Sequence, residues 1–237
     1  MLNAILMASG MGTRMRPITE VTPKPLVKVG GKPMIETIIE GLIRRKVDNI
    51  IIVVGYLGEQ FDYLKNKYHG ILIVKNDVYE TVNNISSVYV AREYLLDGDC
   101  YICEADLYVS DTSILEAELN CSCYYGKMVK GHSDDWVFDQ DENGIITRVG
   151  KYGDDCYNMT GIAYFKADDA RVLYNAINEE YGKSGYETMF WDDVVNKHIS
   201  EFNLMVYPVE HSQIVEIDTV AELEEVNKRV IDKEMSV

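Results

Sequence analysis

The opening of the chain combines a glycine-rich turn with basic side chains, a combination that suits phosphate binding. A short apolar run, Ile5–Met7, leads into Gly10 and Gly12, and Arg14 and Lys24 follow. Glycines let backbone N–H groups approach a phosphate closely, and the two cations can neutralise negative charge that develops there. Strand, turn and cations therefore predict a loop that holds a phosphate, either for binding or for reaction.

This loop differs from two common phosphate-binding motifs. Gly10 and Gly12 lack the third glycine of GxGxxG, which marks dinucleotide sites, and the chain has no GxxxxGK[ST] motif. Four of the five prolines lie between residues 17 and 33 and stiffen the chain after the glycines. The residues around the glycines therefore carry more of the prediction than the glycines themselves.

Two carboxylates follow predicted strands and suit a divalent metal. Asp106 comes shortly after the apolar run Cys100–Cys103, and Asp218 ends the run Glu216-Ile217-Asp218. Ligands of a parallel sheet gather at the carboxyl ends of its strands, and Mg²⁺ prefers a few carboxylates together with phosphate oxygens and water. Alternation along a strand places Glu216 and Asp218 on one face. Asp218 is also explained as a polar residue before a helix cap, and Glu104 either as a partner of these acids or as a plain surface acid.

The first half of the chain predicts the scaffold that positions these groups. Short apolar runs alternate with helical patterns, as a parallel sheet with crossover helices demands. The predicted strands are Ala4–Met7, Asn49–Val54, Ile71–Val74 and Cys100–Cys103, and the predicted helices are Met34–Arg45, Glu59–Tyr68 and Ile85–Leu96.

The rhythm changes after Asp111, where the pattern predicts an antiparallel insertion. Residues 141–144 form a turn, and Thr219 with Glu222 makes a capping box for a last helix. The predicted strands are Cys121–Met128, Trp136–Phe138, Ile145–Val149, Gly161–Phe165, Leu204–Val206 and Ile214–Ile217, and the helices are Asp168–Glu180, Met189–His198 and Val220–Ile231. No repeat or linker interrupts the chain, so we predict one α/β domain over residues 1–237.

Composition excludes several classes of protein. The chain has 237 residues, of which 47% are hydrophobic, and 23 basic against 39 acidic residues give a net charge of −16. Such a surface should repel nucleic acid and anionic lipid, and no apolar run approaches the ~20 residues of a membrane span. The N-terminus lacks the features of a signal peptide, and five cysteines without a CxxC pair indicate reduced, buried thiols. We therefore expect a cytoplasmic protein with small-molecule partners.

The N-terminal motif resembles a family signature. Residues 7–17, Met-Ala-Ser-Gly-x-Gly-Thr-Arg-Met-x-Pro, and residues 22–26, Thr-Pro-Lys-Pro-Leu, are similar to the signature of nucleotidyltransferases that make sugar nucleotides and related activated heads. The resemblance implies a Rossmann-like, mainly parallel sheet flanked by helices, with a nucleotide-binding half over 1–110 and an acceptor-binding half over 111–237. It implies catalytic roles for Arg14 and Lys24 at the α-phosphorus, and Mg²⁺ held by Asp106 and Asp218. The nucleotide contacts that it implies in the loop are Met7, Ala8, Ser9, Gly10, Gly12 and Thr13.

Similarity to one branch, the bacterial CTP:phosphocholine cytidylyltransferases, extends over nearly the whole chain. The residues that carry it are the run from Val54 to Leu64, Asn83-Asn84, Ser87, Trp136, Phe190 to Asp193, and Glu216 to Asp218. This resemblance implies CTP as the nucleotide. It also implies base or nucleotide contacts from Gly55, Tyr56, Asn83 and Ser87.

The same branch implies an acceptor pocket for phosphocholine, and the residue types agree. A trimethylammonium group donates no hydrogen bonds, so a selective site uses aromatic faces and nearby carboxylates, each cation–π contact contributing about 0.5–2 kcal/mol. The predicted pocket residues are Trp136, Phe190, Trp191, Asp192 and Glu216. Phe190 stands where the branch usually has tyrosine.

Other functions remain open at this point. A primary ammonium prefers carboxylates to aromatic faces, so a site dominated by Asp192 and Glu216 would favour 2-aminoethylphosphonate or phosphoethanolamine as acceptor. A sugar-1-phosphate would need several hydroxyl-binding groups in the insertion. A catalytically silent nucleotide-binding regulatory module is a further alternative. Such a module would not need Lys24, Asp106 and Asp218, so the presence of all three argues against it.

Overall fold

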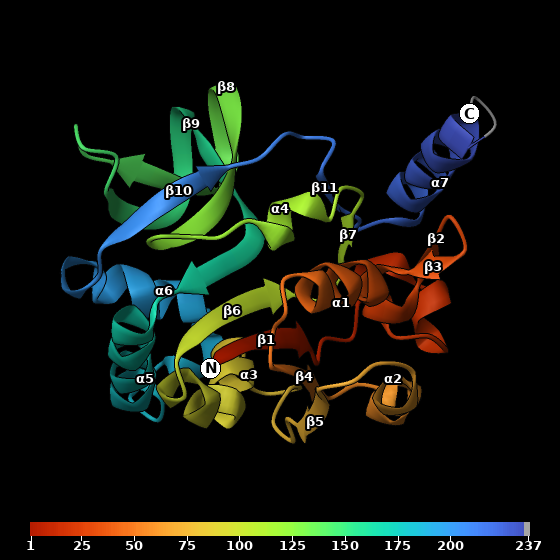
Figure 1. Cartoon of the computed structure of the whole chain (residues 1–237), viewed down its shortest axis with the longest axis horizontal. Helices are drawn as coiled ribbons and strands as arrows, with labels where there is room; N and C mark the ends of the chain where they lie inside the picture. Colours follow the sequence, from red (N-terminus) through yellow and green to blue (C-terminus); the bar gives the residue numbers. More distant parts are fainter. Residues whose placement is uncertain (235–237) are drawn as a thin grey trace.

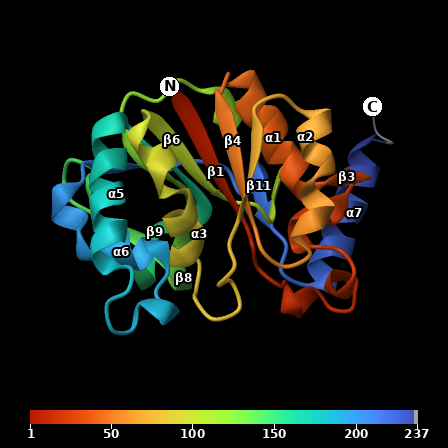
Figure 2. The same ribbon diagram turned by 90° about the horizontal axis from the view of Figure 1, so that it is seen from below.

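The computed structural model describes residues 1–234, built around one mixed sheet with helices on both faces (Figures 1 and 2). The seven strands run in the order β10-β8-β9-β6-β1-β4-β5, and the four on the β5 side are parallel to one another. The sheet strands are β1 (Leu2–Ala8), β4 (Asn49–Val54), β5 (Ile71–Lys75), β6 (Asp99–Glu104), β8 (Ser122–Gln140), β9 (Ile146–Phe165) and β10 (Leu204–Pro208). The predicted fold class is thus confirmed.

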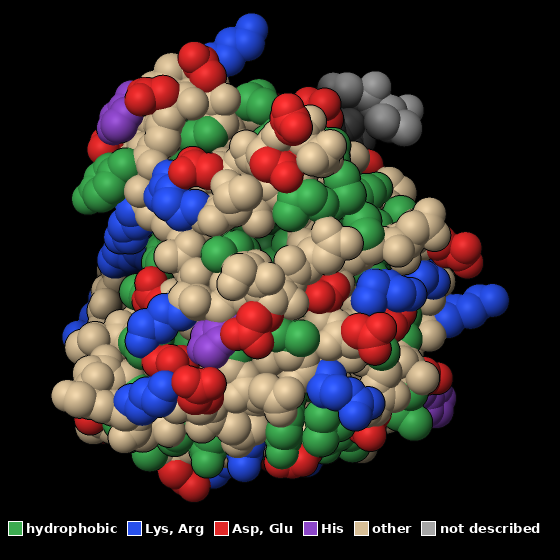
Figure 3. Space-filling model, turned by 90° about the vertical axis from the view of Figure 1, so that its left-hand side faces the viewer, with side chains coloured by type: hydrophobic (Ala, Val, Ile, Leu, Met, Phe, Trp, Pro, Cys, Tyr) green, Lys and Arg blue, Asp and Glu red, His purple; other side chains and the backbone are tan. Residues whose placement is uncertain are grey.

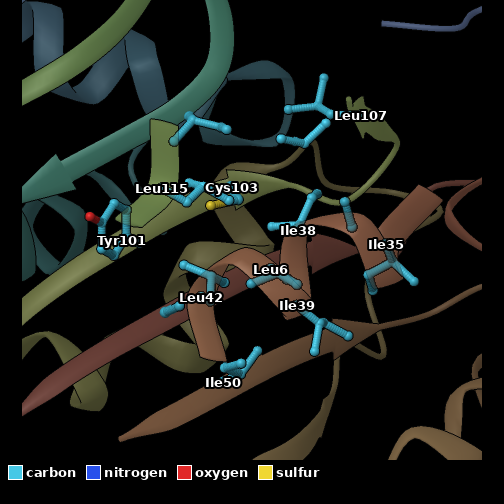
Figure 4. Packing of buried hydrophobic residues seen from close by; sticks show 14 of the residues in the cluster. Leu6, Ile35, Ile38, Ile39, Leu42, Ile50, Tyr101, Cys103, Leu107 and Leu115 are labelled. Atoms are coloured by element: carbon cyan, nitrogen blue, oxygen red, sulfur yellow. The ribbon is translucent and has the colours of Figure 1, made fainter. Parts of the chain in front are cut away.

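Alternate residues of the central strands supply the two layers of the core. Leu6 of β1 packs on one face with helix α1, whereas Ile5 packs on the other with α3, α5 and α6. In α1 the apolar side chains of Ile35, Ile38, Ile39 and Leu42 are completely buried (Figure 4). Among the parallel strands, β5 is not buried on both faces. It lies at the edge of the sheet, and its Leu72 is 37% exposed.

Seven α-helices and several 3₁₀ turns accompany the sheet in the described chain. The α-helices are α1 (Met34–Arg44), α2 (Tyr63–Lys67), α3 (Ile85–Ala91), α4 (Ser113–Glu116), α5 (Ala167–Glu180), α6 (Trp191–Lys197) and α7 (Val220–Glu234). Two predicted helices are shorter than expected. The helix expected over Ile85–Leu96 becomes 3₁₀ from Arg92, and the one expected over Glu59–Tyr68 is divided between a 3₁₀ turn, Gly58–Phe61, and α2.

The antiparallel insertion differs most from the prediction. The four short strands expected between Cys121 and Phe165 are parts of only two long, bent strands, β8 and β9. Their register shifts repeatedly, and Val137 pairs with both Gly150 and Asn158, so β8 folds back against β9. The predicted turn at 141–144 is present, with the Gly144 N–H donating to the Asp141 carbonyl. Bulges bend a strand without ending it, so a pattern of four short runs is compatible with two long strands.

A small ladder brings the C-terminal segment back to the sheet. β11 (Ile214–Glu216) pairs antiparallel with β7 (Leu107–Val109), Glu216 lying opposite Leu107. α7 then begins with the predicted capping box, because the Thr219 N–H donates to Glu222 and the Glu222 N–H donates to the Thr219 hydroxyl. The pairing of β7 with β11 therefore places Asp218, after β11, close to Asp106, after β6.

The surface carries mixed charge. On the face formed by the β8–β9 insertion and the neighbouring helices, acidic and basic side chains lie interspersed (Figure 3). Within residues 1–234, no helix combines the length and apolar character that crossing a bilayer requires.

Candidate active site

Two adjoining cavities open at the carboxyl ends of β1 and β6. The larger has a volume of about 620 Å³ and the smaller about 240 Å³. Five residues line both: Met7, Gly10, Arg14, Asp106 and Asp218. The cavities therefore meet at the predicted metal ligands, the position expected for ligands of a parallel sheet.

The loop after β1 forms the floor between the cavities. Gly12 has a left-handed conformation, with φ of +59°, and an added Cβ would lie 2.9 Å from the Cβ of Lys24. Only glycine fits this close approach without strain. Ser9 is buried and its hydroxyl donates to the Val53 carbonyl at 3.0 Å, which fixes the start of the loop to β4.

Lys24 joins the two carboxylates. Its Nζ donates to Asp106 Oδ2 at 2.7 Å and to Asp218 Oδ1 at 2.6 Å, and Arg14 Nη1 lies 2.8 Å from Asp218 Oδ2. Burial alone would lower the pKa of Lys24, but the two carboxylates outweigh it and raise the pKa above the ordinary value. Lys24 is only 6% exposed, so its charge is directed at this point of the site.

The surrounding acids suit a divalent cation. Burial, followed by repulsion from Asp106 and Glu216, raises the pKa of Glu104 well above its usual range. Glu216 faces the cavity, and desolvation by the walls, followed by the charge of Asp218, raises its pKa to about 7. Such a donor set of clustered carboxylates fits Mg²⁺, which binds one or two carboxylates together with phosphate oxygens.

A second group of possible metal ligands lies outside both cavities and forms ion pairs with neighbouring lysines. Glu179, Glu180 and His198 lie close together on α5 and just after α6. Lys183 and Lys197 both contact Glu180, at 3.0 and 2.7 Å. The group is therefore an ion-pair network that ties α5 to α6.

One wall of the larger cavity comes from the β1 loop and the segment that leads from β5 into α3. Asn83 and Ser87, for which the resemblance implies nucleotide contacts, lie in this wall, and the Ser87 hydroxyl lies 3.4 Å from that of Ser9. Gly55 and Tyr56 do not line either cavity. Gly55 instead lies behind Tyr79, since an added Cβ would meet that ring at 2.6 Å.

The second wall comes from the folded-back insertion and the residue before α6. The rings of Trp136 and Phe190 meet edge to face, with centroids 5.5 Å apart, and Glu216 lies in the same wall. Asp135 and Lys151, which the sequence did not single out, also line it. Of the predicted residues in the smaller cavity, Ala8, Gly12 and Thr13 line it together with Lys24.

Trp191 and Asp192 do not line the cavity, contrary to the predicted acceptor pocket. Trp191 is 3% exposed and stacks on Tyr124, with ring centroids 5.6 Å apart. Asp192 is also 3% exposed and accepts a hydrogen bond from the Tyr124 hydroxyl at 3.1 Å. The reason is that α6 begins at Trp191, so its first turn faces the core while Phe190, before the helix, faces the cavity.

Asn76, Asp135 and Lys151 line the larger cavity but were not predicted from the sequence. Asn76 directly follows β5, just as Asp106 follows β6, so the strand-end argument could have found it. Asp135 and Lys151 reach the cavity only because β8 folds back on β9. No pattern in the sequence indicates this fold-back.

The burial of Asp192 makes a prediction about stability. Burial raises its pKa from the ordinary 3.8 to about 7, opposed by the Tyr124 hydrogen bond. The folded state therefore binds more protons than the unfolded state between these values, and this residue's contribution to stability falls as pH rises from about 4 to 7. Asp192→Asn should unfold at a higher temperature than the wild type at pH 8, with the difference shrinking toward pH 4. A difference in Tm that stays constant over this range would contradict the assignment.

Comparisons with known proteins identify similar chains. The family model described as nucleotidyl transferase matches residues 3–135. The 2-aminoethylphosphonate cytidylyltransferase of Lancefieldella rimae is 51% identical over 221 residues, covering 93% of this chain and 90% of the relative. The choline-phosphate cytidylyltransferase of Streptococcus pneumoniae is 36% identical over 236 residues, 96% of this chain and 99% of the relative. A solved structure of CTP:phosphocholine cytidylyltransferase from Streptococcus pneumoniae superimposes with a TM-score of 0.88, at 33% identity, over 97% of this chain and 99% of that one.

Proposed function

This chain belongs to the nucleotidyl transferase family, as a cytidylyltransferase, and from that premise we propose that it joins CTP to 2-aminoethylphosphonate and releases pyrophosphate. The observation that carries the choice of acceptor is the excess of acidic over basic residues in the lining of the larger cavity. Glu104, Asp135 and Glu216 all line the cavity, and none of them forms an ion pair within the described residues. A primary ammonium donates three hydrogen bonds and supplies the positive charge that would pair with these carboxylates.

The relatives support the same order. The 51% identical relative is a 2-aminoethylphosphonate enzyme, and the choline-phosphate enzyme is less similar, at 36%. Phosphocholine, favoured by the sequence alone, becomes the second candidate. The paired rings of Trp136 and Phe190 favour it, because aromatic faces suit a quaternary ammonium.

In the proposed reaction, a phosphonate oxygen of the acceptor attacks the α-phosphorus of CTP. The bond between this oxygen and the α-phosphorus forms, the bond to the α,β-bridging oxygen breaks, and its electron pair leaves with pyrophosphate. Lys24 and Arg14 would counter the negative charge that grows on the α-phosphate. Mg²⁺ held by Asp106 and Asp218 would supply further neutralisation of the triphosphate. Asn83, Ser87 and the loop from Met7 to Thr13 would bind the nucleotide.

A pyrophosphate-release assay tests the proposed function directly. The protein is supplied with CTP, Mg²⁺ and, in separate reactions, 2-aminoethylphosphonate, phosphoethanolamine, phosphocholine or a sugar-1-phosphate. We expect kcat/KM for 2-aminoethylphosphonate to exceed that for phosphocholine at least about tenfold, ~1.4 kcal/mol. A preference for phosphocholine would select the second candidate. Absence of pyrophosphate with every acceptor would leave a silent nucleotide-binding module.

Glu216→Gln should separate the two acceptors. The change removes a carboxylate charge from the cavity wall and keeps the size of the side chain. We expect kcat/KM for 2-aminoethylphosphonate to fall about tenfold or more, and that for phosphocholine to fall less, because only the primary ammonium donates hydrogen bonds to the lost carboxylate. Equal losses for both acceptors would argue against an ammonium contact.

Trp136→Ala should weaken the acceptor more than the nucleotide. Trp136 lies in the second wall, away from the loop that holds the phosphates, and its ring contacts Phe190. We expect KM for the acceptor to rise severalfold while KM for CTP changes little. Parallel increases in both constants would show that Trp136 has a general structural role.

A further inference from the structure

The segment between α5 and α6 connects the two walls of the larger cavity. It runs from Tyr181 to Phe190, and Phe190 at its end lies in the second wall. Tyr181, Tyr186 and Met189 pack against the core, and Tyr181 stacks on Tyr89. Glu187 and Thr188, just before Phe190, are exposed, so hydrogen bonds to their backbone contribute to the position of this part of the segment.

Two adjacent asparagines in the first wall provide those bonds. The Asn83 N–H donates to the Glu187 carbonyl at 2.8 Å, and the Asn83 side-chain amide donates to the Thr188 carbonyl at 3.2 Å. Asn84 Oδ1 accepts the N–H of Trp191 at 2.9 Å, and the Asn84 N–H donates to Asn83 Oδ1 at 2.8 Å. The pair thus holds the chain on both sides of Phe190.

The same asparagines face the site proposed for the nucleotide. Both line the larger cavity, and they immediately precede α3, which carries Ser86 and Ser87 into the same wall. Ser87 in turn lies beside Ser9 of the glycine loop, at 3.4 Å between hydroxyls. A nucleotide bound against this wall would therefore contact the residues that hold the chain on both sides of Phe190.

We propose that Asn84 is a positioning residue for the acceptor, and that Asn83 and Asn84 couple the two substrates so that each strengthens binding of the other. This inference rests on the proposed function and adds a linkage to it. Ordering the 181–190 segment costs conformational entropy. Binding of the first substrate offsets part of that entropy cost, so the second substrate binds more tightly. By linkage, the nucleotide must raise the affinity for the acceptor by the same factor as the acceptor raises the affinity for the nucleotide.

Binding measurements with an unreactive nucleotide test the coupling. The affinity of 2-aminoethylphosphonate is measured by calorimetry, with and without Mg²⁺ and a CTP analogue that carries a methylene group between the α- and β-phosphorus. In the wild type we expect the analogue to tighten acceptor binding about fivefold or more, within the usual range of such couplings. In Asn84→Ala the factor should fall to near one, and this ratio is independent of any change in the affinity for the analogue alone.

Three further variants keep the result interpretable. Asn84→Asp retains an oxygen that can accept the Trp191 N–H and should retain most of the coupling. Asn83→Ala removes only the side-chain bonds and should reduce it, which provides a second test if Asn84→Ala fails to fold. Asn66→Ala, at an exposed position of α2 remote from these contacts, should behave as the wild type.

The outcomes separate the inference from the proposed function. Binding of both ligands without coupling in the wild type, or unchanged coupling in both Asn84→Ala and Asn83→Ala, would overturn the inference alone. Failure of the wild type to bind either the analogue or the acceptor would instead overturn the proposed function. Equal weakening of the analogue and the acceptor in folded Asn84→Ala would show a general structural role and also overturn the inference.

Discussion

Lys24→Ala is expected to lower kcat at least about a hundredfold, roughly 2.7 kcal/mol of transition-state stabilisation. The reason is geometric, since the buried ammonium of Lys24 lies where the two cavities meet and is held there by Asp106 and Asp218. No other side chain lining the smaller cavity carries a buried positive charge. The loss should appear in kcat measured by pyrophosphate release at saturating CTP.

A neighbouring lysine provides the matched control. Lys28 on β2 (Lys28–Val29) is exposed and lines neither cavity, so Lys28→Ala should keep wild-type turnover. Lys24→Ala also leaves two carboxylates without their ammonium partner, so thermal unfolding must confirm that the variant is folded. A loss of less than tenfold in a folded Lys24→Ala would refute the catalytic role.

Asp106→Ala is also expected to lower kcat strongly, but through loss of the metal. The change removes one of the two carboxylates that meet at Lys24, and with it half of the proposed protein ligands for Mg²⁺. We expect kcat to fall at least about a hundredfold. The Mg²⁺ concentration required for half-maximal rate should rise, and excess Mg²⁺ should restore only part of the rate.

Asp168→Ala controls for loss of an acidic side chain. Asp168 lies in the first turn of α5, is exposed and lines neither cavity. It should leave both kcat and the Mg²⁺ requirement unchanged. A Mg²⁺ requirement that is unaltered in Asp106→Ala would argue that Asp106 does not bind the metal.

The strand pattern predicted that Asp106 lies at the site, whereas its pairing with Asp218 was predicted from the family resemblance. Asp106 follows β6, and the structure places it within reach of the same ammonium as Asp218, although the two are far apart in the chain. What the pattern did not show is the means, the short ladder between β7 and β11. β11 matches the strand predicted over 214–217, whereas the three residues of β7 show too little periodicity to predict a strand.

The acceptor wall was predicted less well, for two physical reasons. A helix can turn either face toward a cavity, and the sequence around α6 did not reveal that Trp191 and Asp192 face Tyr124. Asp135 and Lys151 depend on bulges in β8 and β9, whose positions follow from tertiary packing. Local patterns thus predicted the residues that line the smaller cavity better than those of the wall that contains Trp136 and Phe190.

A crystal structure of the protein with the methylene analogue of CTP and Mg²⁺ would test most directly whether the glycine loop, both basic side chains and the paired acids act on one phosphorus atom. The structure should show the α-phosphate within hydrogen-bond distance of Lys24 Nζ, Arg14 beside the triphosphate, and Mg²⁺ bound by both Asp106 and Asp218. A triphosphate bound outside the two cavities, or a metal that contacts neither aspartate, would contradict the account.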